Sequence, residues 1–443
     1  MPSNAPYWWQ AAPPRSLEQM PVCPQCDVVI VGAGYTGLSA ALPLARAGRS
    51  VQVFDRMRPG EGASTRNGGI TSGSLRPGFK EMIRRFGEER ARTIQHEAIA
   101  ARAFLADFIK TEGLDCDFAM PGRFTGAANT SDYDSLARES EAMNRAFGLD
   151  IQPVPRSAQH DILGTDLYEG GVVRYDIGGL HPAKLHAELL RIALAAGVIV
   201  HGETAVSGVR SAGDGFEVAT ARGQVRASHV ITGTNGYTDA FDRWLRRRMV
   251  PVRSRIIATA PLGDNLMQQL MPRGVMCSET RNLHYYYRPT PDGQRILFGG
   301  RDGTIVGDPQ WPTDRLRQAL ADIFPELQGV EVSHSRFGYV AMNRDSVPRI
   351  FSRRGVNYAV GYCGSGVVWA NWAGRKAAQQ ILGDAAGASG FDFRPPAAVP
   401  FYNGTPWFMP VVYGWLTAKD RLAARKRQKE RAVQKPEGGK PAG

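Results

Sequence analysis

The sequence predicts an α/β (α+β) chain of two interleaved domains, one built on a parallel sheet and the other rich in β-strands. A strand, a glycine loop, a helix and a second strand follow one another over residues 27–55. Residues 356–383 repeat the order strand, glycine loop, helix. Between these units, residues 198–345 carry short strand patterns separated by turns. We therefore expect pieces from both ends and the middle to build one domain and inserted pieces to build the other.

The composition is typical of a folded protein in a reducing compartment. The chain has 443 residues, 43% of them hydrophobic, which is enough for a large core in two or three domains. Its five cysteines are few and odd in number, which argues against a disulfide framework and favours the cytoplasm. We expect neither a leader peptide nor a membrane-spanning run of ~18 apolar residues.

The net charge of +12 is concentrated near the C-terminal end. Residues 419–443 contain nine Lys or Arg and three Asp or Glu, so this segment alone supplies +6. The rest of the chain is mildly basic and lacks the basic and aromatic strand pattern of an RNA reader, so no nucleic-acid partner is expected. The basic segment is predicted to be a solvated tail, with contact to an acidic partner or lipid as the alternative.

The first unit has the features of a dinucleotide site. Residues 27–31, DVVIV, form the continuous apolar run of a strand buried on both faces of a parallel sheet. Gly32, Gly34 and Gly37 follow as GxGxxG, and the next strand ends at Asp55, 18 residues after the third glycine. The glycines permit a turn, close approach to a pyrophosphate and helix–strand contact, and the acid can bind ribose hydroxyls. The motif leaves NAD and FAD open.

The helical segments follow from apolar spacing. The first helix is expected to be broken late by Pro43 and closed by Gly48. Residues 79–113 predict one long helical region, and residues 183–196 predict another helix.

From Val198 the period becomes that of strands, and residues 198–232 predict a β-meander. Residues 245–345 predict strands at RIIATAPL, HYYYRPT, RILFGGR and EVSHSRFGYVAM, with a helix near 313–322. The expected division is an N-terminal extension 1–26, a dinucleotide domain 27–110 plus 175–240 plus 345–390, a β-rich domain 111–174 plus 241–344, and a C-terminal extension with a basic tail 391–443.

Six further motifs stand in chain order: GASTRNGGI at 62–70, YDIGGLHPAKL, VITGTNGYT, YYYRPTPDGQRILFGGR, FGYVAMNRDSVPRI and GYCGSGVVWANWAGRKAAQQILG. Over nearly the whole chain the sequence resembles the D-amino-acid oxidase/glycine oxidase family of FAD-dependent oxidoreductases, and within it the gamma-glutamylputrescine oxidase branch. The resemblance implies a Rossmann-like FAD-binding domain of the glutathione-reductase and D-amino-acid oxidase type, interleaved with a β-rich substrate domain.

The resemblance also implies a cofactor pose. FAD would lie extended, with its adenine end near Asp55 and Val206 and its ring at the boundary with the β-rich domain. Arg66 and Asn67 would lie close to the ring, and the alternative is a flexible turn with Arg66 in solvent. Thr65 stands where glycine is common in this branch. The implied cofactor-binding residues are Gly32, Gly34, Tyr35, Thr36, Gly37, Asp55, Arg56, Ala63, Ser64, Arg66, Asn67, Gly68, Gly69, Val206, Thr234, Gly364, Ser365, Gly366 and Val367.

The second glycine loop, GYCGSGV, has a physical reason to face a flavin. Its backbone N–H groups and the helix N-terminus behind them would stabilise the negative charge of the reduced ring. Gly364, Ser365, Gly366 and Val367 would supply these groups. Related putrescine-type sequences often carry histidine where this chain has Ser365, so no flavin-facing imidazole is expected.

The implied chemistry needs no dedicated general base. A neutral amine can give a hydride to the flavin and leave an imine, which water hydrolyses, so the protein orients and desolvates the substrate. Strand alternation places Tyr286 and Arg288 on one face and Tyr285 and Tyr287 on the other. Tyr286, Arg288 and Arg301 are the predicted substrate-face residues, with sheet-core or surface roles as the alternative.

Two missing residues bear on how the flavin is held and reoxidised. Some monomeric sarcosine oxidases carry a lysine on the strand that matches RILFGGR, where this chain has Arg295 and Arg301. The expected electron acceptor is therefore oxygen or another acceptor. Loop 62–70 lacks the histidine through which some relatives bind FAD covalently, so non-covalent FAD is expected. His181, at a helix start, is expected to be structural.

Three alternatives are open from sequence. CPQC at 23–26 has C-x-x-C spacing, but one pair alone predicts no metal site. TPWFMPVVYGWL, interrupted by Pro410, is expected to pack on the body, with peripheral membrane contact as the alternative. The expected function is oxidation of a small-molecule amine, and the first substrate class is a γ-glutamylated polyamine or an N-alkyl amino acid. Two other functions are open from sequence: an NAD(P)-dependent dehydrogenase and a flavoprotein of RNA modification.

Overall fold

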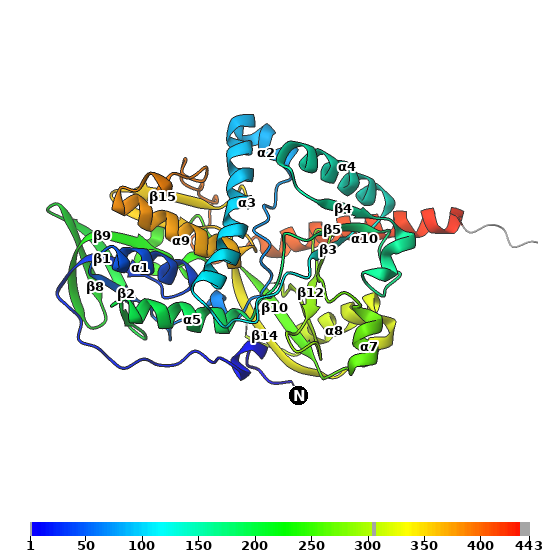
Figure 1. Cartoon of the computed structure of the whole chain (residues 1–443), viewed down its shortest axis with the longest axis horizontal. Helices are drawn as coiled ribbons and strands as arrows, with labels where there is room; N and C mark the ends of the chain where they lie inside the picture. The colour runs from blue at the N-terminus through cyan, green and yellow to red at the C-terminus, as the bar shows by residue number, and fades with distance from the viewer. Residues whose placement is uncertain (1, 304–306, 435–443) are drawn as a thin grey trace, which may run out of the picture. The chain divides into compact units, whose positions relative to one another are not determined.

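The computed structural model describes residues 2–303 and 307–434, and side chains as far as residue 424. The chain divides into two compact units, each assembled from three segments (Figure 1). The segments are Met1–Met120, Ile177–Ile256 and Ser333–Trp407 in unit 1, and Pro121–Asp176, Ile257–Val332 and Phe408–Gly443 in unit 2.

Unit 1 is built on an eight-stranded sheet whose centre is parallel. Its strands run in the order β15-β16-β9-β1-β2-β6, and β7 and β8 continue from β9 as an antiparallel meander. Val28, Val29 and Ile30 are fully buried in β1, which explains the continuous apolar run. The strands are β1 (Gln25–Val31), β2 (Val51–Phe54), β6 (Ile199–His201), β7 (Val206–Ala212), β8 (Gly215–Thr220), β9 (Gly223–Thr232), β15 (Arg349–Arg353) and β16 (Val356–Val360).

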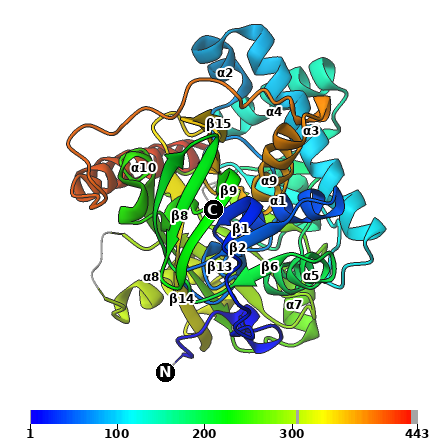
Figure 2. The same cartoon turned by 90° about the vertical axis from the view of Figure 1, so that its left-hand side faces the viewer.

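Two helices of unit 1 approach each other where only glycine fits. A Cβ on Gly374 of α9 would lie 2.2 Å from the carbonyl oxygen of Thr36 in α1. Ser39 Oγ donates to Asn371 Oδ1 across the same contact at 2.7 Å. Figure 2 shows α1 and α9 next to each other beside β1. The helices of this unit are α1 (Tyr35–Arg46), α2 (Phe79–Phe86), α3 (Glu88–Thr111), α5 (Pro182–Ala195), α6 (Arg243–Arg246) and α9 (Gly366–Leu382).

The structure adds two details to the predicted helices. The long helical region over 79–113 is present, and Gly87, with a φ of +81°, divides it into α2 and α3. The first helix does not break at Pro43 but continues to Arg46. Proline removes one helical hydrogen bond, and Leu44, the residue directly after it, is fully buried.

Unit 2 contains six strands in the order β13-β12-β11-β3-β5-β4. β3 and β11 are parallel, and the other neighbouring pairs are antiparallel. Tyr287 is fully buried in a core with Phe298 and Leu316, and Tyr285 packs against the same core, so these tyrosines share a face as strand alternation predicts. The strands are β3 (Arg123–Gly126), β4 (Ile151–Val154), β5 (Gly171–Arg174), β11 (Met276–Glu279), β12 (Tyr286–Pro289) and β13 (Ile296–Arg301).

Two further strands, β10 (Val250–Thr259) and β14 (Val332–Met342), are neighbours and lie mainly in unit 1. The helices of unit 2 are α4 (Thr130–Phe147), α7 (Asp264–Leu270), α8 (Trp311–Ile323) and α10 (Met409–Gln434). Pro410, which interrupts the apolar stretch TPWFMPVVYGWL, stands in the first turn of α10, where its missing N–H costs no hydrogen bond. Among the described residues, no helix is long and apolar enough to cross a membrane.

Candidate functional site

The first glycine loop is closed too tightly for any other residue at Gly37. A Cβ there would lie 1.9 Å from the carbonyl oxygen of Gly32, which itself has a φ of +105°. A Cβ on Gly34 would lie 2.8 Å from Ser64 Oγ. Gly34 directly precedes α1, so the bare backbone of this loop lies at a helix N-terminus, the arrangement that admits a phosphate group.

Asp55 lies at the end of β2 and supports this loop. Its Oδ2 accepts from the Ala33 N–H at 2.8 Å, and its Oδ1 accepts from the Met57 N–H at 2.9 Å. Burial raises the pKa of Asp55 to about 6 against the opposing effect of these two hydrogen bonds. The carboxylate has lone pairs left for ribose hydroxyls, and its first role in the structure is to shape the glycine loop.

Four more of the predicted cofactor-binding residues follow or begin elements of the unit 1 sheet and its first helix. Arg56 forms an ion pair with Asp239 at 2.8 Å, and Val206 is buried at the start of β7. Thr234 Oγ1 shares a hydrogen bond with Thr238 Oγ1 at 2.7 Å. Tyr35 is buried and donates its hydroxyl hydrogen to a backbone carbonyl in α5, so its side chain is structural.

Loop 62–70 is joined to the first glycine loop and to the N-terminal segment. Ser64 Oγ accepts from the Tyr35 N–H at 3.0 Å, at the first residue of α1. Thr65 Oγ1 accepts from Trp9 Nε1 at 2.8 Å and donates to the Gly60 carbonyl at 2.8 Å. These bonds give a physical reason for threonine at position 65.

Asn67 closes the loop on itself. Its Nδ2 donates to the carbonyls of Ala63 at 3.1 Å and Ser64 at 2.9 Å, while its Oδ1 accepts from the Gly69 N–H at 2.8 Å. The side chain of Asn67 therefore fixes the backbone of residues 63–69 by three hydrogen bonds.

Arg66 is held inside the protein and not in solvent. Its side chain is 12% exposed, and its Nε donates to the Glu61 carbonyl at 2.7 Å. The guanidinium lies 4.7 Å from the centre of the Trp9 ring, and burial lowers the pKa of Arg66. The alternative of a flexible turn is therefore wrong for this side chain, whereas its proximity to a flavin ring stays a prediction.

The second glycine loop precedes α9. Gly361, Cys363 and Gly364 have φ values of +82°, +51° and +109°, so the chain turns sharply three times within four residues. A Cβ on Gly364 would meet no atom within 4 Å, so its outer side is open. Ser365 precedes α9 without capping it and shares a hydrogen bond of 3.1 Å with Ser72 Oγ.

The two glycine loops are connected directly. Thr36 Oγ1 and the Tyr362 hydroxyl share a hydrogen bond of 2.7 Å. The Gly361 N–H donates to Asn235 Oδ1 at 2.9 Å, which adds the VITGTNGYT segment to the assembly. Neither Tyr362 nor Asn235 was predicted from sequence to belong to the site. Unit 1 therefore joins two glycine loops, each of which directly precedes the N-terminus of a helix.

The contacts of His181 and Cys363 give both residues structural roles. His181 Nδ1 accepts from the Lys184 N–H at 3.1 Å and so caps α5, which confirms a structural role. Cys363 Sγ donates to the Gly361 carbonyl at 3.1 Å, and burial raises the pKa of this thiol to about 11, so it is not a nucleophile at neutral pH.

The predicted substrate-face residues lie on β12 and β13 of unit 2. The Tyr286 ring lies over Gly299 of the neighbouring strand, where a Cβ would come within 2.3 Å of the ring. Arg288 is 4% exposed, and its Nε donates to the Pro289 carbonyl at 3.0 Å. Arg301 ends β13 half-buried. Tyr286 and Arg301 are therefore partly exposed and Arg288 is buried, and contact of these side chains with a substrate stays a prediction.

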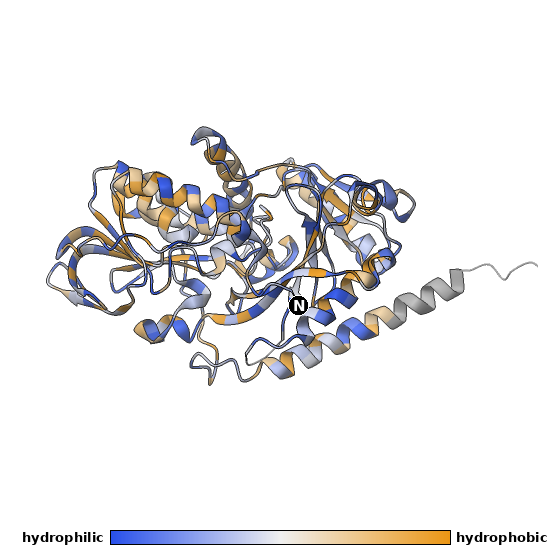
Figure 3. Cartoon of the chain, turned by 90° about the horizontal axis from the view of Figure 1, so that it is seen from below, coloured by the Kyte–Doolittle hydropathy of each residue, from blue (hydrophilic) through white to orange (hydrophobic). Residues whose placement is uncertain are grey.

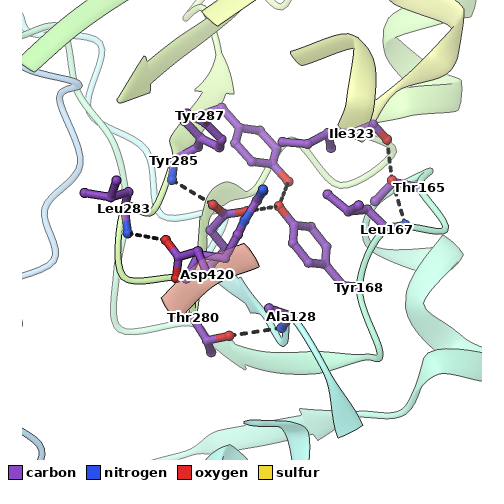
Figure 4. A network of polar contacts seen from close by, with 12 residues as sticks. Ala128, Thr165, Leu167, Tyr168, Thr280, Leu283, Tyr285, Tyr287, Ile323 and Asp420 are labelled. Atoms are coloured by element: carbon purple, nitrogen blue, oxygen red, sulfur yellow. Dashed lines mark hydrogen bonds and ion pairs between the residues drawn. The ribbon is translucent and has the colours of Figure 1, made fainter. Parts of the chain in front are cut away.

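A buried carboxylate holds the turn that leads into β12 (Figure 4). Glu279 accepts from the Tyr285 N–H at 2.9 Å and from the Tyr168 hydroxyl at 3.0 Å. It also forms an ion pair with Arg281, and the Tyr168 and Tyr287 hydroxyls lie 3.1 Å apart. This network fixes the residue directly before Tyr286.

The five cysteines are free. Within the described part of the chain, no three His, Cys, Asp or Glu side chains come together as a metal site.

Residues 27–380 match the DAO family, which is described as FAD dependent oxidoreductase. The probable oxidoreductase OrdL of Rhizobium meliloti is 29% identical over 432 residues, which is 95% of this chain and 99% of that protein. The gamma-glutamylputrescine oxidoreductase of Escherichia coli is 31% identical over 408 residues, which is 90% of this chain and 93% of that protein.

The fold is also that of solved structures. Glycine oxidase from Geobacillus kaustophilus has a TM-score of 0.70 at 18% identity, covering 86% of this chain and 100% of that one. L-proline dehydrogenase from P. horikoshii has a TM-score of 0.68 at 18% identity, covering 82% of this chain and 95% of that one. Both likenesses concern the fold alone.

Proposed function

The chain belongs to the DAO family of FAD-dependent oxidoreductases, and we propose that it oxidises the C–N bond of a γ-glutamylated polyamine or an N-alkyl amino acid. The family match decides for FAD and against the NAD(P)-dependent alternative, and the enzyme acts on small amine or amino-acid substrates. The observation that carries the proposal is the joining of the two glycine loops through Thr36 and Tyr362 in unit 1.

The residues present fit FAD in its implied pose. Backbone at Gly32, Gly34 and Gly37 would hold the pyrophosphate, and the Asp55 carboxylate would hold a ribose hydroxyl. Backbone N–H groups at Gly366 and Val367, at the start of α9, would stabilise negative charge on the ring. When bound, FAD supplies a hydride acceptor at its N5. We expect non-covalent binding, because loop 62–70 contains no histidine.

The protein's part in the reaction is to bind and orient the amine. We propose that Tyr286 and Arg301 contact the substrate, since both are partly exposed at the ends of paired strands. Arg288 would provide positive charge beneath them for a substrate carboxylate. The turn fixed by Glu279 would keep Tyr286 in register.

The test is anaerobic reduction of the purified flavoprotein by a panel of amines. We expect a yellow protein whose flavin absorbance bleaches with γ-glutamylputrescine or an N-alkyl amino acid and not with alcohols. A folded protein that contains no flavin and does not take up FAD would contradict the proposal. A flavoprotein that no amine reduces would contradict the substrate class.

The same anaerobic experiment can also distinguish oxygen from another electron acceptor. The strand that carries a lysine in some monomeric sarcosine oxidases has Arg295 and Arg301 in this chain. Arg295 donates to the Thr259 carbonyl at 2.8 Å, so its side chain is held by the neighbouring backbone. We propose that reoxidation by oxygen is slow and that another acceptor is used. Mixing reduced enzyme with air or with a soluble quinone measures both rates, and faster reoxidation by air would overturn this assignment.

We place the enzyme in the cytoplasm, since its cysteines are free.

A further inference from the structure

The helix α10 has two different faces, of which one is docked on unit 2. Met409, Tyr413, Leu416 and Asp420 follow one another at intervals of four, three and four residues, which places them on one side of the helix. Met409 is 8% exposed, and burial raises the pKa of Tyr413. The Asp420 carboxylate accepts from the backbone N–H groups of Asn282 and Leu283, each at 3.0 Å (Figure 4).

The opposite face exposes apolar side chains in a stripe of the same spacing. Val411 is 75% exposed, Trp415 58% and Leu422 64%, with Ala418 exposed between them. Figure 3 shows apolar residues along this helix alternating with hydrophilic ones. An amphipathic helix normally turns its apolar stripe inward, so a second apolar stripe on the outer face indicates a binding surface.

Positive charge lies next to this stripe. Lys419 and Arg421 are exposed, and Lys419 Nζ lies 3.7 Å from the centre of the Trp415 ring. The sequence continues with Arg425, Lys426, Arg427, Lys429 and Arg431, while the backbone stays helical to Gln434. Residues 419–431 thus contain seven basic and two acidic residues, a net charge of +5.

We propose that the outer face of α10 binds an anionic lipid surface, with the helix lying in the plane of the interface. Tryptophan and aliphatic side chains would enter the boundary between headgroups and acyl chains, and the basic residues would meet anionic headgroups. A second copy of this chain fits less well, because it would bring two segments of charge +5 together. Nucleic acid would satisfy the charge and leave the apolar stripe in water. The proposal goes beyond amine oxidation and does not depend on it.

The experiment measures binding of the full-length holoenzyme to sedimented vesicles. One set is phosphatidylcholine alone, and the other contains about 30 mol % phosphatidylglycerol. The stripe variant is Trp415→Ser with Leu422→Ser. The matched control is Trp311→Ser with Leu194→Ser, which removes side chains that are 50% and 41% exposed on other helices. Melting temperature and anaerobic flavin reduction are measured for each protein, and we expect both to be unchanged.

The wild-type protein and the control are expected to bind the anionic vesicles, and the stripe variant to bind at least about tenfold more weakly. Lys419→Ser with Arg421→Ser should weaken binding at low salt and have little effect at high salt. Equal binding by wild type and stripe variant would overturn the proposal, as would wild-type protein that ignores anionic vesicles. A wild-type dimer that becomes monomeric in the stripe variant would assign the face to a second copy instead.

Discussion

At the residue scale, Ala33 is held from both sides within the first glycine loop. Its N–H donates to Asp55 at 2.8 Å, and its carbonyl accepts from His186 Nε2 at 2.7 Å. His186 is 3% exposed and lies against Gly60, where a Cβ would come within 2.5 Å of the ring. The contact could not be predicted from sequence, because His186 lies inside a helix about 150 residues from Ala33 and the motif YDIGGLHPAKL that directly precedes it implies no role for it.

The burial of His186 predicts a pH dependence of stability. Burial lowers its pKa to about 4, whereas the unfolded chain has a pKa of about 6.5. Between these values the unfolded state binds more protons, so the free energy of unfolding falls as the pH falls. From pH 7.5 to pH 5 we expect wild type to lose about 2 kcal/mol more than His186→Gln. Urea unfolding in excess FAD measures this difference, and equal losses in the two proteins would contradict it.

Gly34 permits a prediction that separates folding from cofactor binding. Gly34→Ala places a Cβ 2.8 Å from Ser64 Oγ, and Ser64→Ala removes that oxygen. The double variant should therefore fold, while its added methyl still keeps a pyrophosphate away from the backbone. We expect the Kd for FAD to rise at least about tenfold relative to Ser64→Ala alone, measured by flavin fluorescence. Equal FAD affinity in the two proteins would show that the pyrophosphate does not bind against the backbone at Gly34.

At the element scale, the order strand, glycine loop, helix was predictable at both ends of the chain. Apolar runs and glycines are local signals, and β1, α1, β16 and α9 lie where those signals place them. The division of the helix at Gly87 was not predictable, since helices also tolerate single glycines. α10 continues past Pro410 because this proline lies in its first turn, where the missing N–H costs no hydrogen bond.

The docking of α10 can be tested at Asp420. This carboxylate accepts two backbone hydrogen bonds at the turn before β12, and loss of a charged acceptor typically costs about 1.5–3 kcal/mol. We expect Asp420→Ala to speed amide hydrogen exchange in residues 281–285, while exchange in β3 stays unchanged. Since this turn precedes Tyr286, the KM for the amine should rise more than kcat falls.

The control for Asp420 is Asp314→Ala, which removes an exposed carboxylate 3.7 Å from Arg317 on α8. An exposed pair of this kind contributes little, so exchange and kinetics should remain those of wild type. Equal effects of the two substitutions would assign the change to lost charge and not to the contact between α10 and the turn.

At the scale of the whole molecule, segments distant in sequence build the site. The first glycine loop, loop 62–70 and the second glycine loop are separated by as much as about 330 residues, yet hydrogen bonds join all three within unit 1. The family resemblance predicted that they act together. The bonds through Ser64, Thr36 and Tyr362 depend on packing and could not be predicted from the motifs themselves.

This arrangement predicts where FAD stabilises the protein. A ligand that binds only the folded state adds about 4 kcal/mol at a thousandfold excess over its Kd. The contacts proposed for FAD lie in segments of unit 1, so removing the flavin should speed amide exchange most in α1, in loop 62–70 and at the start of α9. Exchange in β4 and β5 of unit 2 should change little. Exchange mass spectrometry of the holoenzyme and the flavin-stripped protein gives this map, and readdition of FAD should reverse it. Equal deprotection of β4 and β5 would show that the flavin stabilises both units, and the assignment of its main contacts to unit 1 would then be wrong.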